Sequence, residues 1–114
     1  MKNWLAIRER YMRDGLPIRL GGLAANLSRI KSFAGNEANN HLVESLIEES
    51  RYFIEWTARE AEIETAALLA ELQLELTIWQ FKMGQWWPDA NRRKEIAEKS
   101  NLWSKQILTS SGLI

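Results

Sequence analysis

The single histidine, His41, and the glutamate three residues after it are the first candidates for chemistry in this sequence. On a helix, His41 and Glu44 would share one face, which is a spacing that metal ligands use. Helical di-metal sites need two Glu-x-x-His units and helical zinc sites need His-Glu-x-x-His, whereas this chain has no second histidine. We therefore expect no metal and no cofactor, and interpret His41 as a polar residue at the start of a helix.

Other catalytic patterns are also missing. The only Glu-x-x-Glu pair is Glu95 with Glu98, and no Glu-x-x-Asp accompanies it, which disfavours the magnesium sites of helical pyrophosphohydrolases. The chain has no cysteine, so thiolate nucleophiles and thiolate metal sites are excluded. Gly21 and Gly22 are not followed by Lys-Ser or Lys-Thr, so they do not indicate a phosphate-binding loop. The sequence predicts a protein that is not an enzyme.

Aromatic residues are the next candidates, because six tryptophans are present and several large rings gather in the stretch WQFKMGQWW. Trp86 and Trp87 could form a surface for a protein partner, since exposed aromatic rings are typical of binding surfaces. The competing interpretation places the rings in the core, where they fill the corner between two helices.

Charge is unevenly distributed, although the net charge is zero. Residues 1–34 carry seven basic and two acidic side chains, residues 35–82 carry three basic and ten acidic, and residues 83–114 carry five basic and three acidic. This pattern favours basic helices packed beside an acidic one. The alternative is a nucleic-acid-associated protein, which would use the basic residues of the first segment: Arg8, Arg10, Arg13, Arg19, Arg29 and Lys31.

The spacing of apolar residues predicts an all-α fold in a single domain spanning residues 1–114, with four helices joined by short turns. The helices are expected at about residues 2–13, 20–33, 37–83 and 89–110. Gly15 and Gly35 are typical of helix ends, and Pro88 followed by Asp89 is typical of a helix start.

The third helix is expected to be very long, because residues 37–83 contain neither glycine nor proline. A straight helix of that length would measure about 70 Å. A compact domain of this size has a radius of gyration of only about 13 Å. Either the helix breaks near Thr57 or Thr65 and closes a monomeric bundle, or a partner must cover the part that protrudes.

The second half of this helix is the most apolar stretch, with 12 apolar residues among the 18 at positions 66–83. Its charged residues fall within one narrow stripe, so the other sides need cover. We expect that a second copy of the chain provides it, giving a homodimer in which the helical bundle is completed by dimerisation. The residues expected at this self-association seam are Leu68, Leu72, Leu76 and Trp79.

The sequence therefore predicts a non-catalytic helical-bundle protein with an interaction or regulatory role, self-associating through the apolar half of its third helix. No run of apolar residues is long enough to span a membrane. Charges interrupt the N-terminal stretch where a signal peptide needs an apolar core, so we expect a cytoplasmic protein.

Overall fold

The computed structural model describes residues 2–114 and folds them into α-helices and short 3₁₀ turns, with no β-strand in this range. In chain order the elements are α1 (Trp4–Arg13), α2 (Leu16–Phe33), η1 (Glu37–Asn39), α3 (Asn40–Thr57), η2 (Ala58–Glu60), α4 (Ile63–Trp86) and α5 (Ala90–Ser111). The predicted all-α fold is confirmed, but the described residues form five α-helices rather than four. No helix among these residues is long and apolar enough to cross a bilayer.

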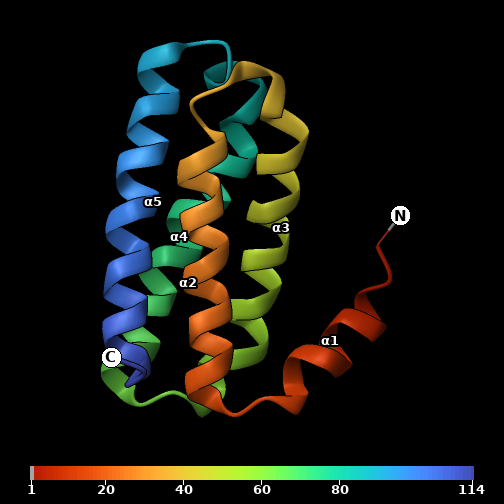
Figure 1. Ribbon diagram of the computed structural model, residues 1–114, viewed down its shortest axis with the longest axis vertical. Coiled ribbons are helices and arrows are strands. Elements are labelled where there is room, and N and C mark those ends of the chain that lie inside the picture. Colours follow the sequence, from red (N-terminus) through yellow and green to blue (C-terminus); the bar gives the residue numbers. More distant parts are fainter. Residues whose placement is uncertain (1) are drawn as a thin grey trace.

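The prediction of one helix over residues 37–83 is wrong. Helix α3 ends at Thr57, η2 follows, and Ala61 and Glu62 adopt extended backbone with ψ angles of 151° and 158°. The chain then reverses, and α4 runs back along α3 (Figure 1). Alanine and glutamate both favour helix, so tertiary packing rather than local propensity ends α3 here. The alternative of a break near Thr57 is confirmed.

The start of α2 also differs from the prediction, because this helix begins at Leu16 rather than near residue 20. Pro17 fits into its first turn, where the backbone N–H that proline lacks would have no helical partner. Gly21 and Gly22 thus lie inside the helix. A Cβ atom at Gly21 would be 2.8 Å from Leu113 Cδ1, so this glycine allows the C-terminus to pack closely on α2.

Helices α2, α3, α4 and α5 lie side by side along the long axis of the molecule and form a four-helix bundle (Figure 1). Helix α2 lies diagonally opposite α4, and α3 and α5 fill the two remaining corners. The core is a set of fully buried aliphatic side chains from all four helices: Leu20, Leu23, Leu27, Ile30, Val43, Ile47, Leu69, Leu72, Leu76, Ile96 and Ile107. The radius of gyration of the folded chain is 13.6 Å, which is that of a compact domain of this size. One chain therefore closes the bundle without a second copy.

Helix α1 stands outside the bundle and leans against α3 (Figure 1). Its aromatic side chains make the contact: Trp4 stacks on Tyr52 with ring centroids 4.1 Å apart, and Tyr11 stacks on Phe53 at 3.8 Å. Each such pair contributes about 0.5–1.5 kcal/mol in addition to the stabilisation from the apolar area that it buries. Aromatic stacking therefore fixes α1 to α3.

Candidate interaction surface

The residues predicted to form a self-association seam lie on the inner face of α4. Leu72, Leu76 and Trp79 are buried, and Leu68 is half-buried against the same core. Their cover comes from the other helices of the same chain, because the break after α3 brings α3 beside α4. The premise that a second copy must cover them is therefore wrong.

The opposite face of α4 is apolar as well, and it is exposed. We call it the outer stripe, and its members are Ile63, Ala67, Ala70, Leu74, Ile78 and Phe81. They follow one another at intervals of three or four residues, which keeps them on one side of the helix. The exposed fractions of the large side chains are 86% for Ile63, 65% for Leu74, 43% for Ile78 and 83% for Phe81. A surface helix normally turns polar residues to this side.

The charged residues of α4 lie beside the outer stripe instead of on it. At 100° per residue, Glu64, Glu71 and Lys82 are about 60–80° to one side of its centre. Glu75 lies further round on the same side, where its carboxylate accepts hydrogen bonds from Trp103 Nε1 at 2.8 Å and Lys99 Nζ at 3.5 Å. This charged edge therefore follows the seam between α4 and α5, and the outer stripe faces away from the bundle.

The tryptophans predicted to form a partner surface lie where α4 turns into α5, and the structure does not expose them as a pair. Trp87 is buried, and its Nε1 donates a hydrogen bond to the Glu37 carbonyl oxygen at 2.6 Å. Trp86 is half-buried, with the Arg92 guanidinium 4.4 Å from its ring centroid. Phe81 is the well exposed aromatic residue of this region. The interpretation that places the rings in the core, at the corner between two helices, therefore holds for Trp87.

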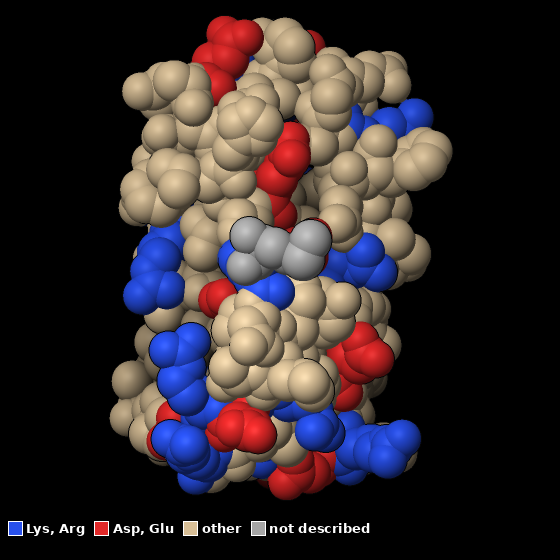
Figure 2. Space-filling view, turned by 90° about the vertical axis from the view of Figure 1, so that its right-hand side faces the viewer, with Lys and Arg blue, Asp and Glu red and all other residues tan. Residues whose placement is uncertain are grey.

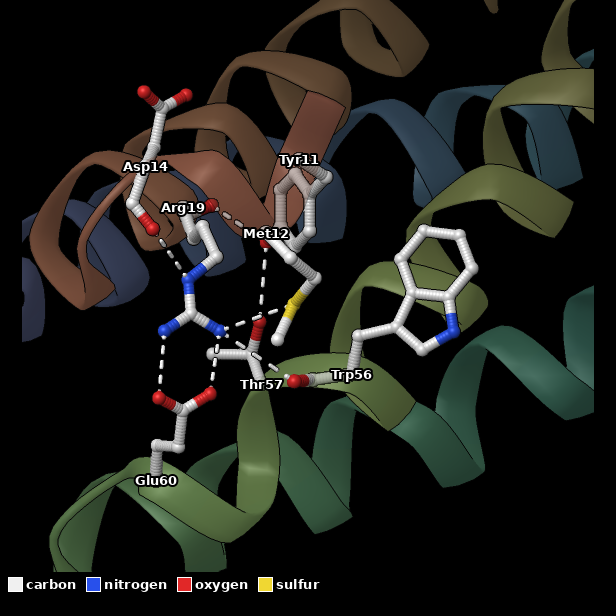
Figure 3. A network of polar contacts seen from close by, with 7 residues as sticks. All are labelled: Tyr11, Met12, Asp14, Arg19, Trp56, Thr57 and Glu60. Carbon is white, nitrogen blue, oxygen red and sulfur yellow. Dashed lines mark hydrogen bonds and ion pairs between the residues drawn. The ribbon is translucent and has the colours of Figure 1, made fainter. Parts of the chain in front are cut away.

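A polar network joins α1, α2 and the end of α3, and its centre is Arg19 (Figure 3). The guanidinium forms two hydrogen bonds with the carboxylate of Glu60, at 2.8 and 3.0 Å. Its Nε donates to the Asp14 carbonyl oxygen at 3.0 Å. Tyr11 donates from its hydroxyl to the Arg19 carbonyl oxygen at 2.7 Å and accepts from Thr57 Oγ1 at 3.3 Å. The network positions α1 against the bundle.

Burial and pairing shift the ionisation of three groups in this network. The hydrogen bond with Glu60 raises the pKa of Arg19, and the same bond lowers the pKa of Glu60 below its ordinary value of 4.5. Burial of the hydroxyl raises the pKa of Tyr11 to about 12. Arg19 is 4% exposed whereas Glu60 is 51% exposed, so solvent screens the carboxylate but not the guanidinium. These shifts fit a structural junction rather than a site that exchanges protons at neutral pH.

Arg19 is therefore not available for nucleic acid, which corrects one member of the predicted basic set. Arg8, Arg10 and Arg13 are exposed on α1, whereas Arg29 and Lys31 are exposed near the far end of α2, about 20 Å further along the bundle. On the face that carries α1 and α3, basic and acidic side chains are mixed (Figure 2). The structure thus divides the predicted basic residues between two places.

His41 and Glu44, the first candidates for chemistry, line one open surface cavity together with Ser45 and Glu48. His41 is exposed in the first turn of α3. Within residues 2–114, no group of three or more His, Asp or Glu side chains is placed to hold a metal ion. A polar cleft of about 250 Å³ lies between α3 and α4. Two of its side chains join the helices: Gln73 donates to the Arg51 carbonyl oxygen, and Arg51 donates to Gln80 Oε1.

No protein-family model, no curated protein and no solved structure matches this chain. The outer stripe is the feature that sequence reasoning missed, although its signal is present in the sequence. The periodic apolar positions at 63, 67, 70, 74, 78 and 81 form a second face, 180° from the one that the core uses.

Proposed function

We propose that this protein is a non-catalytic helical-bundle interaction protein that forms a homodimer through the outer stripe of α4. The observation that carries the proposal is the exposure of Ile63, Leu74, Ile78 and Phe81 in a single continuous row. Scattered exposed apolar residues need no explanation, but a contiguous apolar row is typical of an interaction site.

The exposed area of the row is a large part of what one side of a standard interface buries. At roughly 200 Å² per large side chain, the exposed fractions of these four residues sum to on the order of 550 Å². The largest apolar patch on a typical monomer measures about 300–600 Å², so this row is at the upper end of that range. Each partner of a standard interface contributes about 800 Å². Ala67, Ala70 and the stems of the neighbouring charged residues can supply the remainder.

A second copy of the chain is the partner that this face fits best. A straight apolar row on one helix can pack against an identical row, and two-fold self-association is the commonest oligomeric arrangement. Helix α1 leans on α3, and α2 lies across the bundle, so neither of these helices covers the outer stripe. The row is therefore open along its whole length.

The proposal is tested by the molar mass in solution, measured by light scattering behind a sizing column. The wild type should give twice the chain mass of 13.2 kDa. Leu74→Glu should give a folded monomer with unchanged helicity by circular dichroism, because a carboxylate would be buried without a partner at the centre of the seam. Ile18→Glu is the matched control, since Ile18 is also exposed but lies on α2, and it should remain a dimer. A monomeric wild type would overturn the proposal.

A further inference from the structure

We infer, resting on the proposed function, that the two α4 helices of the homodimer run antiparallel about a two-fold axis close to residue 72. In this arrangement, positions that face one another across the seam have residue numbers adding to about 144. Self-association through the outer stripe alone would leave this register open.

Side-chain size supports the antiparallel register. Ala70 would face the partner's Leu74, Ala67 would face the partner's Ile78, and Ile63 would face the partner's Phe81. Each alanine thus meets a large side chain, and each end of the seam holds one aliphatic and one aromatic residue. A parallel register would place alanine on alanine at 67 and 70 and leave gaps there, whereas well-packed interfaces have few voids.

Charge supports the same register. Glu64 and Lys82 lie on the same edge of the outer stripe, at its two ends. In an antiparallel pair the two-fold axis is perpendicular to both helices, so the charged edges of the two copies lie on the same side of the seam. Glu64 of one chain would therefore lie beside the partner's Lys82 at each end. In a parallel pair the two-fold axis would run along the helices, and the charged edges of the two copies would lie on opposite sides of the seam. Glu64 and Lys82 would then have no oppositely charged partner across it, whereas the antiparallel register gives each of them one.

The absence of cysteine from the sequence makes disulfide trapping a direct test. The full-length variants Ile63→Cys and Phe81→Cys are each oxidised alone and as an equimolar mixture, at a concentration where light scattering shows both reduced variants to be dimers, and are then separated on a non-reducing gel. In the antiparallel pair the two copies of position 81 are about 27 Å apart. A disulfide needs Cα atoms within about 7 Å. Each variant alone should therefore stay uncrosslinked, and the mixture should give crosslinked dimer.

Two results would overturn the inference while leaving the proposed function intact. Crosslinking of Phe81→Cys alone, at a higher yield than in the mixture, would indicate a parallel pair. A dimeric mass that Leu74→Glu abolishes, with no crosslinking in any sample, would place the two outer stripes in another register. A monomeric mass for the wild type would instead remove the proposed function itself, so the two failures are distinguishable.

A charge-reversal pair gives a second readout that does not alter the apolar row. Glu64→Lys alone and Lys82→Glu alone should each raise the dimer dissociation constant severalfold, because each creates a like-charge contact at both ends. Mixing the two variants restores opposite charges at both ends, so the mixed dimer should bind as tightly as the wild type. Equal weakening in the mixture and in the separate variants would contradict the antiparallel register.

Discussion

The inner face of α4 carries Leu69, Leu72 and Leu76, and the outer face carries Ile63, Leu74 and Phe81, so large apolar side chains line both faces of one helix. The inner residues are fully buried by the other helices of the same chain, whereas the outer ones are exposed. Apolar content therefore cannot tell a folding surface from a binding surface. The two are distinguished by which side of the helix the neighbouring helices occupy.

The largest effect is expected from a cavity on the inner face. Leu72→Ala should lower the free energy of unfolding by about 3 kcal/mol, because a fully buried leucine loses its packing and leaves a void. Leu74 lies two residues further along α4, on the outer stripe. Leu74→Ala should change the free energy of unfolding of the monomer by less than about 0.5 kcal/mol. Urea unfolding of dilute protein measures both values. Equal losses would show that the two faces do not have separate roles.

The next effect concerns association. Phe81→Ala should raise the dimer dissociation constant by about 30-fold, as expected for an aromatic residue that anchors an interface. Its unfolding free energy in dilute solution should match that of the wild type, since Phe81 makes little contact with the core. Sedimentation equilibrium gives the dissociation constant. An unchanged constant would remove Phe81 from the interface.

The sequence predicts some of the helix boundaries that create the two faces of α4, but not all of them. The glycine and proline signals located the end of α1 and the start of α5, and the apolar spacing identified the helices. The reversal after Thr57 carries no such signal, because Ala61 and Glu62 are ordinary helix residues and only packing decides their conformation. Once that reversal is missed, Leu72 and Trp79 lose the neighbours that cover them, and a second chain is wrongly required.

The candidate site shows the same dependence on the fold. The sequence marks α4 as unusually apolar, but it does not say which side α3 and α5 will cover. Arg19 is similarly ambiguous: as an arginine in a basic segment it suggests nucleic acid, and its pairing with Glu60, 41 residues away, appears only when the chain folds back.

The Arg19–Glu60 pair lies away from the outer stripe, so it can be altered by substitution without changing that surface. Because the hydrogen bond from Arg19 lowers the pKa of Glu60, the ionised carboxylate stabilises the folded state. That stability is present above pH 4.5 and is lost as the pH falls through the lowered pKa. Glu60→Gln should therefore lose less unfolding free energy than the wild type between neutral pH and about pH 3. The same difference is expected in the monomeric Leu74→Glu background, and its absence there would connect this network to the dimer.

The smallest effect is expected at Glu71, which lies on the charged edge close to the proposed two-fold axis. The partner's Glu71 would lie nearby, and two like charges at a partly exposed seam weaken association slightly. Glu71→Gln should therefore lower the dissociation constant by about two- to fivefold. Raising the salt concentration should shrink this difference, because screening already reduces the repulsion in the wild type. A weaker dimer would show that Glu71 instead has a favourable partner.

The central claim is that the inner face of α4 folds one chain and the outer face joins two copies. Its most direct test is the thermal unfolding midpoint of the wild type and of Leu74→Glu over a range of protein concentrations. The wild-type midpoint should rise with concentration, because association stabilises the folded state by mass action. The Leu74→Glu midpoint should be independent of concentration and equal to that of dilute wild type. A wild-type midpoint that does not change with concentration, or a Leu74→Glu midpoint far below it at every concentration, would contradict the claim.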